Sequence, residues 1–328
     1  MKKLFKIFFL LILLAQPHLV FAAVSWTELF PTGAGYDAGW RITCSTNGNV
    51  VLSITNALTT PFVGRVYISN DGGTSWTETQ PAGNTLQRWQ GLSSDYDGSN
   101  LVVTSYVSSG NLGRIYLSTN QGTSWTEMQP AGNVDKNWVA ADQSDDGSVI
   151  LVGANNGGRL YLSTNTGTSW TEMQPAGNVD KNWIRASVSS DGNTLLASNI
   201  TAGDGRLFLS KNKGVTWNEV KPYAGGTNTY FGVAMDATGT NMIAAAYPNQ
   251  SNGRVYISRD SGSTWIEVQP AGNVNRSWYA ADMDRTGKYI LLGSYGGRLY
   301  SSSDYGTTWT ENQPVGDVNK NWTSTALT

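Results

Sequence analysis

Histidine and cysteine are almost missing from this chain of 328 residues, which has one of each, His18 and Cys44. A lone cysteine cannot form an intrachain disulfide, so the fold must be stabilised by packing. Without histidine beyond residue 18, a Ser-His-Asp triad, a Cys-His pair and an ordinary zinc site are excluded. We expect no bound metal and no cofactor.

Charge is also scarce, at 14% of residues. Residues 1–22 are predicted to be a cleaved secretory signal, with a basic start, a short apolar run and a cleavage site after Ala22. An uncleaved anchor helix is the alternative, but Pro17 and His18 interrupt the run. We expect a secreted, periplasmic or extracellular protein with no membrane insertion after cleavage, and residues 23–328 as a single domain.

Cleavage leaves 19 of the 22 basic residues against 24 acidic ones, a net charge of −5. This mild acidity gives no electrostatic footprint for nucleic acid. The expected partners are glycans or another protein.

An internal repeat dominates what is present. The segment GTSWTEMQPAGNVDKNW at residues 122–138 recurs letter for letter at 167–183, and looser copies surround both. The first tryptophans of the copies recur with a period near 47 residues, at Trp26, Trp76, Trp125, Trp170, Trp217, Trp265 and Trp309. Such a period indicates a repeat architecture.

One unit predicts four short strands, at about residues 138–143, 149–153, 159–163 and 169–173. Four antiparallel strands per repeat are typical of a β-propeller blade. A β-sandwich is the alternative, but it does not predict near-identical copies at this period. We therefore expect an all-β propeller of four-stranded antiparallel blades.

The turn between the third and fourth strands has the pattern S-x-[D/N]-x-G-x-[S/T]-W in six copies, from Ser69–Trp76 to Ser302–Trp309. This pattern resembles the Asp-box, or BNR repeat, of sialidases and many other propellers. The resemblance implies a sialidase-like fold, with Asn120, Asn165 and Asn212 as departures that keep the acceptor oxygen. Exported photosystem II assembly factors are similar in having such repeats.

Six complete units begin at about Trp40, Trp89, Trp138, Trp183, Tyr230 and Trp278. Ser25–Phe30 and Trp322–Thr328 remain, and would supply the outer and inner strands of an incomplete closing blade. Since propellers commonly close by pairing both termini, we expect seven blade positions, with six blades as the alternative.

A sialidase active site is not expected. All seven glutamates lie two residues after a repeat tryptophan, whereas a catalytic carboxylate should be singular and lie in a cleft. Six of twelve arginines belong to a repeated Gly-Arg pair. The segment Asp95–Asn100 lacks the spaced acidic ligands of a calcium loop, so we expect a plain hairpin turn there.

A second aromatic series stands at the start of each innermost strand, after loops that carry basic residues. A ring of such side chains could stack sugar rings and bond their hydroxyls, or the rings could instead pack between blades. The candidate ligand-binding residues are Trp40, Trp89, Trp138, Trp183, Tyr230, Trp278, Trp322, Lys136, Lys181, Arg276 and Lys320.

The sequence therefore predicts a non-enzymatic binding module, with multivalent glycan binding as the first hypothesis. A protein-interaction or assembly scaffold is the second. An exo-glycosidase of the sialidase type is the third.

Overall fold

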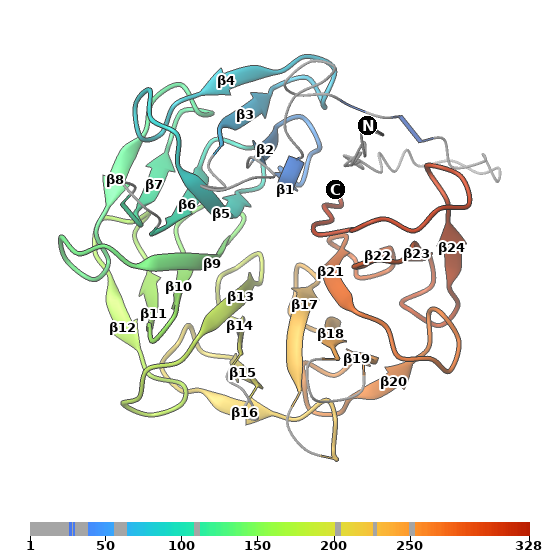
Figure 1. Ribbon diagram of the computed structural model, residues 1–328. Coiled ribbons are helices and arrows are strands. Elements are labelled where there is room, and N and C mark those ends of the chain that lie inside the picture. Colours follow the sequence, from blue (N-terminus) through green and yellow to red (C-terminus); the bar gives the residue numbers. More distant parts are fainter. Residues whose placement is uncertain are drawn as a thin grey trace.

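The protein is a six-bladed β-propeller (Figure 1). The computed structural model describes residues 26–27, 29, 39–55, 64–107, 112–200, 205–225, 228–248 and 253–328. Within these ranges 24 strands form six four-stranded antiparallel sheets, and no helix occurs. The predicted all-β propeller of four-stranded blades is therefore confirmed. The predicted signal at residues 1–22 lies outside the described residues.

Each blade consists of four consecutive strands, numbered from the axis outward. Blade 1 contains β1 (Gly39–Cys44), β2 (Val51–Thr55), β3 (Val66–Ser69) and β4 (Thr77–Thr79). Blade 2 contains β5 (Arg88–Ser94), β6 (Leu101–Tyr106), β7 (Ile115–Ser118) and β8 (Thr126–Met128). Blade 3 contains β9 (Asn137–Gln143), β10 (Ile150–Asn155), β11 (Leu160–Ser163) and β12 (Thr171–Met173).

The second half of the ring repeats this order. Blade 4 contains β13 (Trp183–Val188), β14 (Leu195–Asn199), β15 (Arg206–Ser210) and β16 (Asn218–Val220). Blade 5 contains β17 (Thr229–Met235), β18 (Met242–Tyr247), β19 (Val255–Ser258) and β20 (Ile266–Val268). Blade 6 contains β21 (Trp278–Met283), β22 (Ile290–Ser294), β23 (Leu299–Ser302) and β24 (Thr310–Asn312).

The expectation of seven blade positions is wrong. Every strand of the described residues belongs to one of six sheets, and residues 322–328 form no strand. Trp26, Thr27 and Leu29 are likewise outside any strand, and Ser25, Glu28 and Phe30 are not described. The physical reason is that residues 322–328 make individual hydrogen bonds to blades 6 and 1 in place of the regular antiparallel ladder of an inner strand.

The C-terminal segment instead lies between blades 6 and 1, held by individual hydrogen bonds. The Ser324 hydroxyl accepts the Ile42 N–H at 3.2 Å and donates to the Ile42 carbonyl at 3.1 Å. On the other side, the Leu327 N–H donates to Asp282 Oδ2 at 2.7 Å. The inner strands β1 and β21 are thus joined through residues 324–327.

The two faces of the ring differ. The face called here the loop face carries the loops between blades and those between second and third strands. The opposite face, called the turn face, carries the turns that follow each inner strand. On the turn face backbone N–H groups donate to the carbonyls of the next blade at 2.9–3.2 Å, in the chain Asn47, Tyr96, Asp145, Ser190, Ala237 and Arg285.

A charged bridge also crosses the turn face. Arg285 of blade 6 forms an ion pair with Asp145 of blade 3, and its guanidinium carbon lies 5.1 Å from the ring centre of Tyr96. Blades 3 and 6 face each other across the axis in Figure 1. The turn-face end of the central channel is therefore spanned by side chains.

The repeated turn between third and fourth strands has the expected hydrogen bonds. In blade 1, Asp71 Oδ1 accepts the Ser75 N–H at 2.8 Å, and in blade 2, Asn120 Oδ1 accepts the Ser124 N–H at 2.9 Å. The asparagine copies therefore keep the acceptor function, as expected. The geometry of the turn is observed, while membership of the Asp-box group stays a prediction.

Candidate functional site: the axial cavity and its mouth

The aromatic series that was predicted to line a ligand site is buried. Six of its members are only 1–5% exposed: Trp89, Trp138, Trp183, Tyr230, Trp278 and Trp322. Trp89 packs edge-on against Tyr116 of its own blade, with ring centres 5.9 Å apart, and its indole N–H donates to the Gly64 carbonyl of the preceding blade at 3.2 Å. This burial favours the packing interpretation over a sugar-stacking platform.

Trp40 departs from this series. Gly39 pairs with Thr55 before the β-bulge of blade 1, where Trp183 pairs with Asn199 in blade 4. Trp40 therefore lies one residue beyond the position of the other members, although its place in the sequence repeat grouped it with them.

The four predicted basic residues lie at separate junctions between blades. The backbone N–H of Lys136 donates to the Gly113 carbonyl at 3.1 Å, and Lys181, Arg276 and Lys320 make the equivalent bond at 3.0, 3.0 and 2.9 Å. Gly113 is needed there because an added Cβ would lie 1.8 Å from the Lys136 carbonyl oxygen. The structure spreads these side chains around the loop face and does not gather them into one site.

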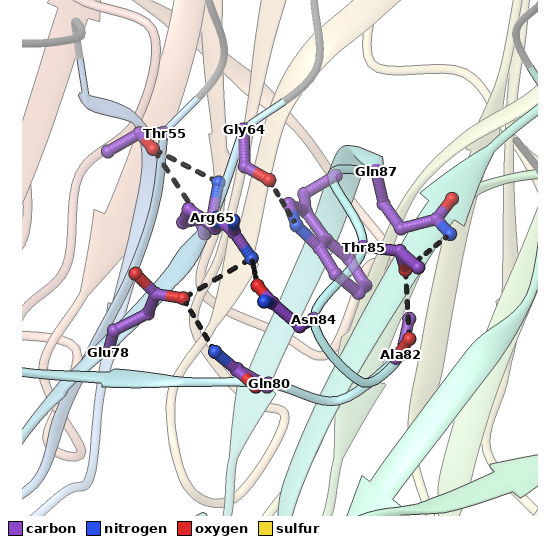
Figure 2. A network of polar contacts seen from close by, with 10 residues as sticks. Thr55, Gly64, Arg65, Glu78, Gln80, Ala82, Asn84, Thr85 and Gln87 are labelled. Atoms are coloured by element: carbon purple, nitrogen blue, oxygen red, sulfur yellow. Dashed lines mark hydrogen bonds and ion pairs between the residues drawn. The ribbon is translucent and has the colours of Figure 1, made fainter.

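The repeated arginines and glutamates pair with each other on the outer strands. Figure 2 shows blade 1, where Arg65 Nη1 lies 3.3 Å from Glu78 Oε1 and donates to Asn84 Oδ1 at 2.9 Å. The same arginine–glutamate pair forms in all six blades. The six glutamates that the structure describes are therefore ion-paired on the outer strands, which supports a structural role for them.

A cavity of about 210 Å³ occupies the axis of the ring. Its wall comes from the inner strands of all six blades together with residues 323–325. Four charged side chains line it: Arg41, Asp142, Arg185 and Asp282.

Arg41 and Arg185 occupy the same strand position in blades 1 and 4, directly after the β-bulge. Blades 3, 5 and 6 carry Ala140, Gly232 and Ala280 at that position. The small residues leave room for two long side chains. Burial lowers the pKa of Arg185, and the positive charge of Arg41 lowers it further.

Asp142 and Asp282 lie two residues further along the inner strands of blades 3 and 6, toward the turn face. Asp142 Oδ2 accepts the Val188 N–H of the next blade at 2.8 Å, while Ser93 donates to its Oδ1 at 3.2 Å. Burial raises the pKa of Asp142 to about 6 and that of Asp282 to about 7, although these backbone donors act in the opposite direction.

An aromatic cluster stands beside the arginines, on the loop face of blades 5 and 6. The rings of Phe231 and Tyr279 stack with centres 4.8 Å apart, and Tyr247 and Tyr295 pack around them at 5.1 and 5.7 Å. The Arg185 guanidinium lies 5.6 Å from the ring centres of both Phe231 and Tyr279. Tyr295 is 44% exposed, so the cluster reaches solvent.

Sequence analysis missed this group because it departs from the repeat. The available signal was a charged residue in the middle or later part of an inner strand, which occurs at Arg41, Asp142, Arg185 and Asp282. The predicted hairpin turn at 95–100 joins β5 to β6 as expected, with Asp95 Oδ2 accepting the Asn100 N–H at 2.9 Å. Among the described residues no cluster of metal-ligating side chains occurs.

One family model matches part of the chain. It is Sortilin-Vps10 (sortilin, neurotensin receptor 3), over residues 64–204, which is less than half of the sequence. That family has a β-propeller domain, and the match supports the fold. No curated protein sequence matches the chain. In the described part, no helix has the length and apolarity to cross a membrane.

Several solved structures share the fold at low sequence identity. The xyloglucanase of Xanthomonas campestris is 16% identical with a TM-score of 0.66 and covers 87% of this chain, which spans about half (49%) of that enzyme. YCF48 bound to D1 peptide is 13% identical with a TM-score of 0.61, covering 87% of this chain and 84% of its own. Hydrazine synthase of Kuenenia stuttgartiensis is 16% identical with a TM-score of 0.61, covering 88% and 80%. The neighbours thus include both enzymes and a protein bound to a peptide, and at this identity they show the fold alone.

Proposed function

We propose that this protein is a non-catalytic glycan-binding module whose single site is the aromatic cluster at the mouth of the axial cavity. The observation that carries the proposal is the partly exposed ring cluster of Phe231, Tyr247, Tyr279 and Tyr295 beside an open polar cavity. This site replaces the buried tryptophan series as the candidate sugar-binding surface. The proposal therefore has one binding site per propeller, in place of the expected multivalent binding.

The shape of the site supports capture of a chain end. A cavity of about 210 Å³ is smaller than the ~300–1,000 Å³ typical of pockets that enclose a whole small molecule. One terminal group of a longer ligand fits this space, while the following residues lie over the tyrosines. Flat ring faces and phenolic hydroxyls suit the apolar faces and hydroxyls of a sugar.

Two features favour binding over catalysis. The glutamates of the six blades are ion-paired on the outer strands. The channel carboxylates, Asp142 and Asp282, are each held by a backbone N–H of the next segment. A pair of catalytic carboxylates must instead flank a bond of the substrate, with one of them free to donate a proton.

A scaffold role is the second candidate, since one structural neighbour is YCF48 bound to D1 peptide. A peptide end would enter the same cavity. The two candidates differ in what the tyrosines must recognise, so ligand screening separates them.

The test is a glycan array on the purified protein, followed by titration of the best ligand into Tyr295→Ala. Loss of a stacked ring should weaken binding by about two- to thirteenfold, because a well-placed aromatic contact contributes about 0.5–1.5 kcal/mol beyond its area. No glycan bound above background, together with binding of acidic or C-terminal peptides, would overturn the glycan proposal in favour of the scaffold.

Tyr305→Ala is the matched control. Tyr305 is 42% exposed, close to the 44% of Tyr295, but it lies in the repeated turn of blade 6 on the turn face. Its backbone carbonyl, which accepts from Arg259 at 2.7 Å, is kept in the variant. Binding should be unchanged by this substitution.

A further inference from the structure

We propose that Arg41 and Arg185 together form a receptor for one tetrahedral oxyanion, so that the bound sugar carries a sulfate or phosphate ester. The inference rests on the proposed glycan site and names the chemical class of its ligand. The two esters share the chemistry that matters here: a tetrahedral group with several charged oxygens.

The first observation is that neither guanidinium has an anionic partner in the part of the chain that the structure describes. Among the described residues neither Arg41 nor Arg185 takes part in an ion pair, whereas the arginine of each Gly-Arg pair has one. Arg185 donates to the Ile184 carbonyl at 2.8 Å, and its Nη2 lies 3.5 Å from the Tyr279 carbonyl. The Arg41 guanidinium makes no hydrogen bond to another described residue. Most of the ten N–H donors are therefore free to face a ligand.

The second observation is the arrangement of the two side chains around the axis. Strands β1 and β13 face each other across the ring in Figure 1, and both arginines line the same cavity. A planar carboxylate presents two oxygens in one plane and suits one guanidinium fork. A tetrahedral ester has three free oxygens, which can accept from two forks that approach from opposite sides.

The third observation is the held orientation of Arg185. Its guanidinium lies 5.6 Å from the ring centres of Phe231 and Tyr279, so the aromatic cluster and the cation form one surface. Ordering such a side chain before binding reduces the entropy that binding costs. A sugar over the tyrosines would thus place its charged substituent at the arginines.

The electrostatics of the cavity are consistent with this arrangement. Burial lowers the pKa of both arginines, which means that their charged forms are destabilised without a counter-charge. The raised pKa of Asp282, about 7, reduces the negative charge deeper in the cavity near neutral pH. A bound dianion would supply the missing charge at the mouth.

The test is calorimetric titration of inorganic sulfate and inorganic phosphate into the full-length protein at low chloride, with acetate as the carboxylate comparison. Sulfate or phosphate should bind at least tenfold more tightly than acetate. Arg185→Gln should weaken that binding at least tenfold, and Arg185→Lys should restore only part of it, because lysine keeps the charge but loses the fork. Arg259→Gln removes one exposed arginine on the turn face and should leave binding unchanged.

The outcomes separate this inference from the proposed function. A sulfated glycan that binds tenfold more tightly than its desulfated form, with the difference lost in Arg185→Gln, supports both. Glycan binding that needs Tyr295 but is not competed by sulfate or phosphate overturns the oxyanion inference and keeps the glycan module. Sulfate binding at the arginines without any glycan binding keeps the receptor and overturns the module. Equal affinity for acetate and sulfate overturns the tetrahedral ester and indicates a carboxylate-bearing ligand.

Discussion

Asp282 Oδ2 accepts the backbone N–H of Leu327 at 2.7 Å, and Asp142 Oδ2 accepts that of Val188 at 2.8 Å. The two aspartates therefore make the same bond to the next inner segment, one of them within the regular ring and the other at its closure. The Cys44 thiol donates to the Leu327 carbonyl at 3.5 Å from the far side. Closure of the ring depends on a carboxyl group that lies in the cavity.

The stability of the protein should fall as the pH rises from 4.5 to 8. Because burial raises the pKa of Asp282 to about 7 and that of Asp142 to about 6, the folded state binds protons that the unfolded state releases near pH 4. The stabilisation is complete below pH 4 and is lost as the pH passes 6 to 7. Urea unfolding should show a decrease in the free energy of unfolding of about 5 kcal/mol across this range, at about 1.36 kcal/mol per pH unit for each group.

Asp142→Asn combined with Asp282→Asn should flatten this pH dependence, since asparagine keeps an acceptor oxygen without titrating. Asp317→Asn, an exposed rim residue, is the control and should leave the slope unchanged. The pH dependence of the repeated-turn residues has the opposite sign. Hydrogen bonds lower the pKa of Asp71, Asp260 and Asp304 to about 2, so their contribution to stability is lost only as the pH falls below 4. If the free energy of unfolding of the double variant falls with pH as steeply as that of the unmodified protein, the pH dependence does not arise from Asp142 and Asp282.

Trp138→Ala should destabilise the protein by about 3–5 kcal/mol, because it leaves a cavity between blades 2 and 3. Glycan affinity should stay unchanged, in keeping with a side chain that is 2% exposed. Val134→Ala, at a position 47% exposed in the preceding loop, should change stability by less than about 0.5 kcal/mol. Weakened binding without loss of stability in Trp138→Ala would restore the tryptophan ring as a ligand site.

Gly122→Val should destabilise blade 2 for two separate reasons. The φ angle of Gly122 is 75°, which a β-branched residue strongly disfavours, and a Cβ would lie 2.9 Å from Ile68 Cδ1. Gly132→Ala isolates the backbone contribution, since φ is 78° there and no atom lies within 4 Å of an added Cβ. Thermal unfolding should show about 1–2 kcal/mol for Gly132→Ala and a larger loss for Gly122→Val. Equal losses would show that the contact with Ile68 contributes nothing.

No product should be released from aryl-sialosides or other aryl-glycosides between pH 4 and 8. The carboxylates of the axial cavity accept hydrogen bonds from backbone N–H groups, and the glutamates of the outer strands are paired with arginines. A chromogenic assay sensitive to single turnovers checks this expectation. Turnover that Asp282→Asn abolishes would show that the cavity is an active site.

The blade architecture was predictable because each 47-residue copy carries its own strands, turns and packing tryptophan. The predicted strand at 159–163 corresponds to β11, Leu160–Ser163, and the turn glycines have positive φ as expected. Closure was not predictable, because Trp322–Thr328 has the composition of an inner strand but is held by individual hydrogen bonds to Ile42 and Asp282 in place of a strand ladder. The position of Trp40 failed for a similar reason, since a β-bulge shifts the register in a way that spacing does not reveal.

The candidate site could not be predicted from the sequence repeat. Arg41 and Arg185 come together only because blades 1 and 4 face each other across the axis, and they fit only because other blades carry alanine or glycine at that position. Neither relationship is visible in a single unit. The aromatic cluster likewise joins side chains from two blades, Phe231 and Tyr247 of blade 5 with Tyr279 and Tyr295 of blade 6.

Hydroxyl-radical footprinting of the ligand-bound protein tests the location of the site most directly. Three tyrosines with similar exposure report on different places: Tyr295 at 44% on the loop face, and Tyr96 at 45% and Tyr305 at 42% on the turn face. At saturating concentrations of the best glycan, the oxidation rate of Tyr295 should fall severalfold while those of Tyr96 and Tyr305 stay constant. Protection of Tyr96 or Tyr305, with Tyr295 unchanged, would contradict a binding site at the mouth of the axial cavity.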